Sequence, residues 1–195
     1  MSPAAPLPTK PRRASAPGGG VSIRSSRDAD ALSLSEIYSR HVLLGTGTFE
    51  LEAPAPAEMA RRRAEVLAQG WPWLVAEHGG RVVGFAYAGD FRPRPAYRFC
   101  VEDAVYVDAD FTGLGVGSRL LAELIAHCEA AGARQMVALI GDSANAASIG
   151  LHRAAGFRDA GVMSAVGWKL GRWLDVVLLQ RSLGPGNAAA PEGRP

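Results

Sequence analysis

A glycine-rich run at residues 112–118 constrains this chain more than any other feature. The run reads Thr-Gly-Leu-Gly-Val-Gly-Ser; it follows a β-rich segment ending in Val105-Tyr106-Val107 and opens an amphipathic helical pattern. Glycine lets a backbone approach a ligand closely, and the first N–H groups of a helix lack intrahelical partners and lie at the positive end of its dipole. The pattern therefore predicts either a tight structural turn or a site for an anion such as a pyrophosphate.

Two common phosphate-binding motifs do not fit this run. A Walker A loop needs a lysine near its end, but the run continues into Ser118-Arg119 and holds no lysine. A dinucleotide fingerprint starting at Gly115 would need a small residue at Leu120 and an acidic residue about 20 positions further on, where Gln135-Met136 stand. A typical P-loop is therefore excluded, and Rossmann-type binding is disfavoured.

The sequence after the run favours a ligand site over a simple turn. Gly132 stands where a helix C-terminal cap is expected, after apolar residues at helical spacing: Val116, Leu120, Leu121, Leu124, Ile125 and Cys128. A strand is predicted at 136–140 and a second helix at 145–155. Earlier in the chain, the same patterns predict helices at 29–42 and 57–69 and strands at 73–77 and 81–89. Asn145 and His152 are seven residues apart, close to two helical turns, so both project from nearly the same helix face. A ligand lying along that face could contact both side chains.

These features resemble the GNAT superfamily of acyl-coenzyme A N-acyltransferases. The family's pyrophosphate loop reads Gln/Arg-x-x-Gly-x-Gly/Ala, which residues 112–117 match except at the first position, Thr112. Its later helix carries an Asn, a Tyr seven residues on and a Gly-Phe or Gly-Tyr pair, where this chain has Asn145, His152 and Gly156-Phe157. The resemblance implies the GNAT fold, an α/β (α+β) fold with a mixed, mostly antiparallel twisted sheet flanked by helices.

The resemblance also implies acetyl-coenzyme A (acetyl-CoA) as cosubstrate. Backbone amides of the loop would hold its pyrophosphate. The site is therefore expected to bind this group even though Thr112 replaces the long polar Gln or Arg side chain of the family pattern. The residues expected to bind acetyl-CoA are Val105, Tyr106, Val107, Gly113, Leu114, Gly115, Val116, Gly117, Ser118 and Asn145.

A closer resemblance, over roughly residues 23–181, is to the phosphinothricin and methionine sulfoximine N-acetyltransferases. The segments that carry it recur in order with nearly the family spacing, and include Trp71-Pro72-Trp73-Leu74-Val75-Ala76-Glu77, Gly84-Phe85-Ala86-Tyr87-Ala88-Gly89, Ala96-Tyr97, Ile140-Gly141 and Gly167-Trp168-Lys169. This resemblance implies direct acetyl transfer to the amine of a small amino acid analogue, without a covalent enzyme intermediate. It also implies a homodimer.

The reaction needs a base, because a free alkyl amine is mostly protonated at pH 7. The family alignment places a catalytic carboxylate at Glu102, and strand alternation directs Asp103 to the opposite face. Tyr106 shares the Glu102 face, so its hydroxyl could assist, although a strand tyrosine more often packs. His152 could accept the amine proton as imidazole. As imidazolium it could instead protonate the departing thiolate or donate a hydrogen bond to it. A backbone N–H within 105–107 is the expected donor to the oxyanion.

The acceptor is expected to bind near Arg92 and Arg94, which flank Pro93 in a loop after the Tyr87 strand. Paired hydrogen bonds from guanidinium groups suit a carboxylate or phosphinate. An ordinary charged surface loop is the alternative interpretation. The resemblance adds Tyr97, Thr48 and Phe49 to the substrate side.

Composition sets the remaining expectations. The 195 residues, of which 48% are hydrophobic, suit one domain at 21–183, with Pro-, Ala-, Gly- and Ser-rich tails at 1–20 and 184–195 that should be disordered. The net charge of +2 favours neither nucleic acid nor a membrane surface as partner. The two cysteines, and the lack of a signal-peptide or membrane-spanning pattern, favour the cytoplasm, and no metal site is expected.

Two alternative functions remain open. A GNAT enzyme for a polyamine, a peptide N-terminus or an aminoglycoside would be expected to lack the arginine pair and to prefer cationic acceptors. A non-catalytic acyl-CoA sensor would bind the ligand without turnover, although Glu102 and His152 argue against it.

Overall fold

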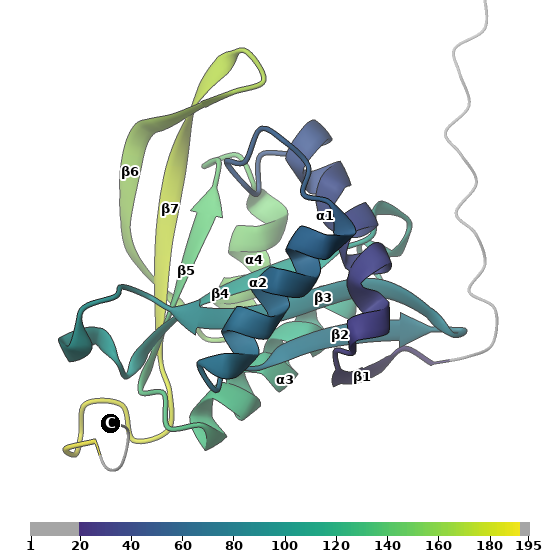
Figure 1. Cartoon of the computed structure of the whole chain (residues 1–195). Coiled ribbons are helices and arrows are strands. Elements are labelled where there is room, and N and C mark those ends of the chain that lie inside the picture. Colours follow the sequence, from purple (N-terminus) through teal and green to yellow (C-terminus); the bar gives the residue numbers. More distant parts are fainter. Residues whose placement is uncertain (1–19, 192–195) are drawn as a thin grey trace, which may run out of the picture.

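The computed structural model describes residues 20–191, so all but the last residue of the N-terminal tail predicted at 1–20 lies outside it. Figure 1 shows a single twisted sheet with the strand order β1-β2-β3-β4-β5-β7-β6. Only the β4–β5 pair is parallel, which confirms the mixed, mostly antiparallel sheet. The strands are β1 Ser22–Ser25, β2 Trp73–His78, β3 Arg81–Asp90, β4 Cys100–Val107, β5 Gln135–Gly141, β6 Arg158–Lys169 and β7 Arg172–Ser182.

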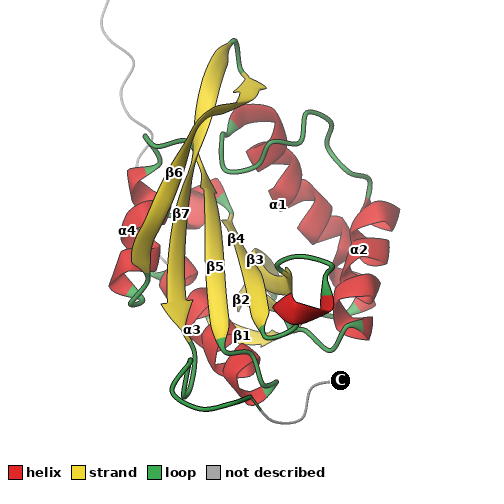
Figure 2. Cartoon of the chain, turned by 90° about the vertical axis from the view of Figure 1, so that its left-hand side faces the viewer, coloured by secondary structure: helices red, strands yellow, loops and turns green. Residues whose placement is uncertain are grey.

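Helices cover both faces of this sheet, as Figures 1 and 2 show together. The helices are α1 Ala31–Leu44, α2 Pro56–Ala68, α3 Val116–Ala130 and α4 Ala146–Ala154, with 3-10 turns at Asp28–Asp30, Pro95–Tyr97 and Ala109–Phe111. Side chains of β2 alternate, because Trp73 and Val75 pack against α1 and α2 whereas Leu74 and Ala76 pack against α3. The alternation divides the apolar core into two layers.

The helical and strand periods predict most of these elements. The helices expected at 29–42, 57–69 and 145–155 correspond to α1, α2 and α4, and the expected strands correspond to β2, β3 and β5. The same patterns do not predict β1, β6 or β7. In β6 nearly every residue is exposed, and the register with β7 shifts between Asp159 and Gly161 and again between Met163 and Gly167, so no two-residue alternation develops.

An opening between β4 and β5 positions the site. The two strands pair only as far as Asp103 with Ala138, after which β4 continues beside β3 to Val107 and β5 continues beside β7 to Gly141. Beyond Asp103 the β4 and β5 edges that face each other are unpaired. Backbone N–H and C=O groups in such an opening can bind an extended ligand.

Features outside the sheet add little to the site. Residues 184–191 form turns after β7, where the Arg134 guanidinium donates to the carbonyl oxygens of Gly186 and Ala190. The disorder predicted for 184–195 stays a prediction. No helix within residues 20–191 has the length and apolar character needed to cross a bilayer.

Candidate active site

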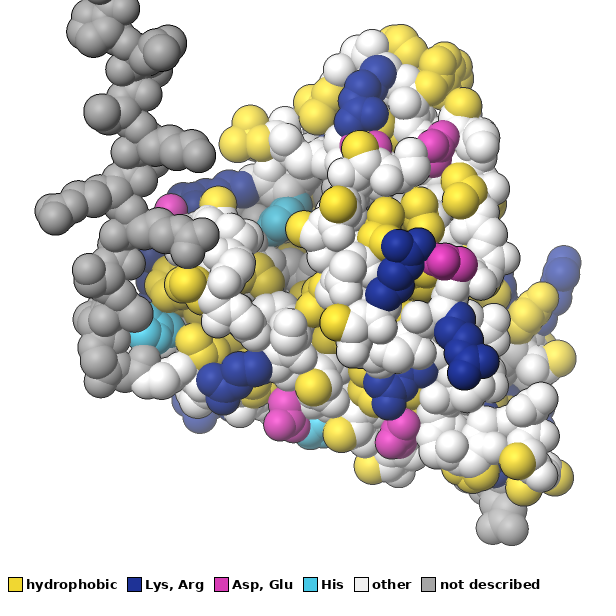
Figure 3. Space-filling model, turned by 180° about the vertical axis from the view of Figure 1, so that it is seen from behind, with side chains coloured by type: hydrophobic (Ala, Val, Ile, Leu, Met, Phe, Trp, Pro, Cys, Tyr) yellow, Lys and Arg dark blue, Asp and Glu magenta, His cyan; other side chains and the backbone are white. Residues whose placement is uncertain are grey.

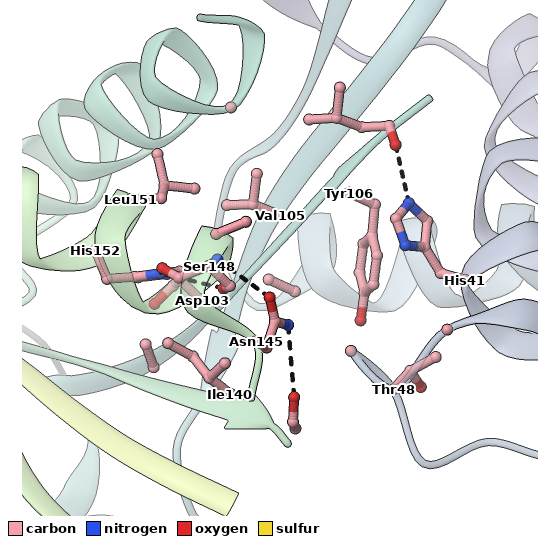
Figure 4. A pocket seen from close by; sticks show the side chains of 18 of the residues that line it. His41, Thr48, Asp103, Val105, Tyr106, Ile140, Asn145, Ser148, Leu151 and His152 are labelled. Atoms are coloured by element: carbon pink, nitrogen blue, oxygen red, sulfur yellow. Dashed lines mark hydrogen bonds and ion pairs between the residues drawn. The ribbon is translucent and has the colours of Figure 1, made fainter. Parts of the chain in front are cut away.

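A cavity of about 1100 Å³ lies at the opening between β4 and β5. Its walls come from α1, the loop at 45–49, the glycine run, α4 and the two strands (Figure 4). It contains most of the predicted site residues: Thr48, Phe49, Glu102, Val105, Tyr106, Val107, Gly113, Gly115, Val116, Gly117, Ser118, Asn145 and His152. The predicted residues that do not line it are Leu114, Arg92, Arg94 and Tyr97.

The glycine run has the geometry of an anion site. Gly113 and Gly115 adopt left-handed φ values of 73° and 78°, and Gly115 is the N-cap of α3. The amides of residues 116–118 find no hydrogen-bond acceptor within residues 20–191, so they are available to a ligand. The Thr112 hydroxyl donates to the Ala109 carbonyl at 2.9 Å and thus stabilises the preceding turn. These donors fit a pyrophosphate.

Asn145 shapes the opposite wall. Its Oδ1 accepts the Ser148 N–H at 3.2 Å, and its Nδ2 lies 3.5 Å from the Gly141 carbonyl oxygen (Figure 4). The side chain therefore caps α4 and holds the start of the helix against the end of β5.

Glu102 lies half-buried on β4, on the same sheet face as Tyr106. Burial raises the pKa of its carboxyl, and the neighbouring Asp103 adds to this effect while Arg92 opposes it. A carboxylate with a raised pKa accepts a proton more readily than an exposed one. Its place in the cavity suits a general base.

Tyr106 is nearly buried beneath the cavity. Its ring packs edge-on against Tyr38, with centroids 4.8 Å apart, and against His41 at 5.2 Å. Burial raises the pKa of its phenol well above the ordinary value, with Tyr87 and Tyr38 adding to the effect. Tyr106 therefore stays protonated and can donate a hydrogen bond.

His152 is buried on the other face of the sheet, where it pairs with Asp103. Its Nδ1 donates to the Ser148 carbonyl at 2.7 Å, and its Nε2 donates to Asp103 Oδ2 at 2.9 Å. Because both partners are acceptors, the ring is an imidazolium with no free lone pair. Burial lowers the pKa of His152, but the Asp103 carboxylate and the Ser148 carbonyl more than offset it, so the pKa is raised.

This ion pair predicts a pH-dependent stability. The raised pKa of His152 stabilises the fold fully below the unfolded value near 6.5, and the contribution is lost as pH rises through the folded value. We expect the unfolding temperature to fall as pH rises above about 6.5. The variant Asp103→Asn should lose this slope and be less stable at pH 6, whereas Asp159→Asn, on an exposed ion pair with Arg153, should keep it. Parallel curves for parent and Asp103→Asn would contradict the assignment.

The loop at 45–49 is held over the cavity by distant residues. The Tyr38 hydroxyl lies 2.8 Å from Thr48 Oγ1, and the buried Lys169 ammonium of β6 donates to the Thr48 carbonyl at 2.7 Å. The Phe49 ring occupies the space above Gly167, where any Cβ would overlap it. These contacts fix both Thr48 and Phe49 at the cavity wall.

The predicted arginine pair lies on an exposed loop outside the cavity wall. The Arg92 guanidinium lies 4.4 Å from the centroid of the Phe91 ring, which also contacts Tyr97 edge-on. Arg92 is close enough to Glu102 to lower the pKa of that carboxyl, whereas Arg94 starts a 3-10 turn and is exposed. The structure therefore associates Arg92, but not Arg94, with the Glu102 end of the cavity.

Several cavity residues were not predicted from the sequence: Tyr38, His41, Tyr87, Asp103, Gly141 and Ser148. The α1 pattern contains a signal for two of them. Leu34, Tyr38 and His41 recur at four- and three-residue spacing, which places all three on the sheet-facing side of the helix. For Asp103, strand alternation predicts the sheet face on which the side chain lies, but it does not predict the pairing with His152.

A glycine-rich helix start beside a split pair of parallel strands, with a carboxylate in the same cavity, is the arrangement expected of an acyl-CoA-dependent acyltransferase. The comparisons agree. The profile described as "Acetyltransferase (GNAT) family" matches residues 43–157. The chain belongs to the GNAT acetyltransferase family, and it is an acetyl-CoA-dependent N-acetyltransferase.

Individual relatives narrow this class. The chain is 51% identical to phosphinothricin N-acetyltransferase of Alcaligenes faecalis, over 87% of this chain and 86% of the relative. It is 43% identical to an L-methionine sulfoximine/L-methionine sulfone acetyltransferase of Pseudomonas paraeruginosa, over 87% and 98%. A GNAT superfamily phosphinothricin acetyltransferase from Sinorhizobium meliloti, solved in complex with acetyl-CoA, superposes with a TM-score of 0.86 at 46% identity, covering 88% of this chain and 93% of that chain.

The expectation of no metal stays a prediction. Among residues 20–191, no group of three or more His, Cys, Asp or Glu side chains is placed to hold a metal ion.

Proposed function

We propose that this enzyme acetylates the amine of a small amino acid analogue of the phosphinothricin or methionine sulfoximine type. The observation that carries the proposal is that one cavity contains both the glycine-run amides and the Glu102 carboxylate. The names of the relatives support the acceptor class. Arg92 supports it too, because a guanidinium near the base can pair with the acid group of such an acceptor.

In the proposed mechanism, each wall of the cavity has one role. Amides of the glycine run hold the pyrophosphate of acetyl-CoA, and a backbone N–H within 105–107 donates to the carbonyl oxygen of the thioester. Glu102 removes a proton from the ammonium group of the acceptor, and the neutral amine then attacks directly. The His152–Asp103 pair lies on the thiolate side and fixes the packing of α4 against β4.

Thiol release from acetyl-CoA with separate acceptors tests the proposal. We expect turnover with phosphinothricin and methionine sulfoximine, and none with spermidine or a peptide amine. Turnover confined to the last two would assign another acceptor class, and binding of acetyl-CoA without turnover of any amine would indicate a sensor.

Arg92 provides a sharper test of the acceptor class. Replacing Arg92 with alanine should raise the KM for an acidic acceptor by about tenfold or more while kcat changes little, because a charge-assisted hydrogen bond is worth roughly 1.5–3 kcal/mol. The control is Arg98→Ala, on the same loop, whose guanidinium stacks on Phe99 as Arg92 stacks on Phe91. Equal KM values for both variants would count against a role for Arg92 in binding.

We also propose a cytoplasmic homodimer. Both cysteines are free thiols, as is typical of a reducing compartment. Apolar side chains are exposed on the β6–β7 hairpin, among them Val162, Met163, Val166, Trp168 and Trp173. Figure 3 shows hydrophobic side chains gathered at the top of the molecule, where this hairpin ends. Sedimentation should give twice the 20.5 kDa chain mass; a monomer would refute the dimer.

A further inference from the structure

His41 is a second histidine of the cavity, and the mechanism above does not use it. It lies on α1, half-buried, beside the ring of Tyr106 (Figure 4). Its Nε2 is 3.0 Å from the carbonyl oxygen of Val107. A carbonyl oxygen can only accept, so Nε2 carries the proton and the lone pair of the neutral ring is on Nδ1.

This lone pair is available to a ligand. No hydrogen-bond partner for His41 Nδ1 is found within residues 20–191. His152 differs, because both of its ring nitrogens donate to acceptors inside the protein. Of the two cavity histidines, His41 is therefore the one that can accept a proton without first breaking a hydrogen bond.

The surroundings of His41 keep it neutral. Burial lowers the pKa of His41, and the Lys169 ammonium lowers it further, while the Val107 carbonyl and the Asp108 carboxylate oppose them. Asp108 raises the pKa of His41 less than an unpaired carboxylate would, because its carboxylate also pairs with Arg40, at 3.2 Å, and with Arg81. The phenols of Tyr106 and Tyr38 complete the surroundings and are uncharged, since burial raises the pKa of each.

The reaction leaves a role for a second proton acceptor. An acceptor that enters as an ammonium ion carries three N–H protons, and the amide product keeps one. Two protons therefore leave the nitrogen, of which one ends on the coenzyme A sulfur and one in the solvent. Glu102, as a single carboxylate, holds one proton at a time.

We propose that His41 accepts the second proton through Nδ1, an inference that rests on the proposed function. The C–N bond forms and the C–S bond breaks, with the electron pair of the latter remaining on sulfur. One nitrogen proton goes directly to Glu102, and the other passes through water in the cavity to His41 Nδ1, because Glu102 and Val107, whose carbonyl His41 contacts, are five residues apart on β4. The sulfur then takes up the Glu102 proton, and the His41 imidazolium releases the other proton to water in the cavity.

The variant His41→Gln tests this assignment. Its side-chain amide can keep the hydrogen bond to the Val107 carbonyl but has no titrating lone pair. In the parent, the acid side of the log kcat–pH profile should reach a slope of two below both pKa values, because Glu102 and His41 must both be unprotonated; the raised Glu102 pKa and the lowered His41 pKa narrow the interval between the two titrations. In His41→Gln, kcat should fall by about 100-fold and the slope should approach one.

Controls separate this role from a structural one. His41→Gln should keep the parent's unfolding temperature and its dissociation constant for acetyl-CoA. Imidazole added to His41→Ala should restore part of kcat. An unchanged slope with kcat within about twofold of the parent would overturn the role of His41 alone. A parent without turnover of any amine would instead overturn the proposed function, before any variant is compared.

Discussion

Replacing Glu102 with glutamine should lower kcat by about 100- to 10,000-fold, the range that general base catalysis contributes. The glutamine amide has nearly the shape of the carboxyl but cannot accept the ammonium proton at neutral pH. Burial raises the pKa of Glu102, so the parent should lose kcat as pH falls through this raised value. Thiol release at saturating acetyl-CoA and acceptor measures the effect.

The control for this substitution removes a carboxylate elsewhere. Glu123 is exposed on α3, and Glu123→Gln changes the net charge by the same amount. Both variants should bind acetyl-CoA as the parent does, because the glycine-run amides are untouched. If kcat of Glu102→Gln stayed within about tenfold of the parent, the base would have to be another group, and His41 would be the first candidate.

Local patterns were sufficient to predict the parts of the fold that depend on short-range chemistry. The glycine run and the apolar stripe of α3 involve residues close in sequence, and the structure places them as expected. Asn145 differs from the expectation, because it is the N-cap of α4 and its side chain accepts from the Ser148 N–H, whereas the sequence placed it within the helix. Strand alternation also separated Glu102 from Asp103 correctly, since only Asp103 faces α4.

The unpredicted parts depend on contacts between distant residues. The Lys169 ammonium reaches the Thr48 carbonyl across 121 residues of sequence, and His152 meets Asp103 across 49. Spacing from Asn145 put His152 at the site but could not show that both ring nitrogens are occupied. The edge strand β6 has no buried face, so neither of the two standard periods marks it.

Gly141 gives the second large effect, because the 45–49 loop rests on it. It ends β5, and a Cβ there would overlap the Thr46 carbonyl oxygen and lie 3.0 Å from Phe49 Cε1. A backbone carbonyl cannot rotate away as a side chain can, so the loop itself must move. We expect Gly141→Ala to destabilise the fold by about 1–3 kcal/mol, the usual cost of overpacking, and to raise the acceptor KM by about tenfold.

Gly89→Ala is the matched control, because Gly89 also lies in a strand and a Cβ there meets nothing within 4 Å. Replacing an unhindered strand glycine by alanine reduces the entropy of the unfolded chain, so this variant should be neutral or slightly stabilised. Urea unfolding and the KM for each substrate measure both variants. Since Gly141 contacts the loop rather than the glycine run, the KM for acetyl-CoA should change less than that for the amine. Identical behaviour of the two variants would show that the loop position does not depend on Gly141.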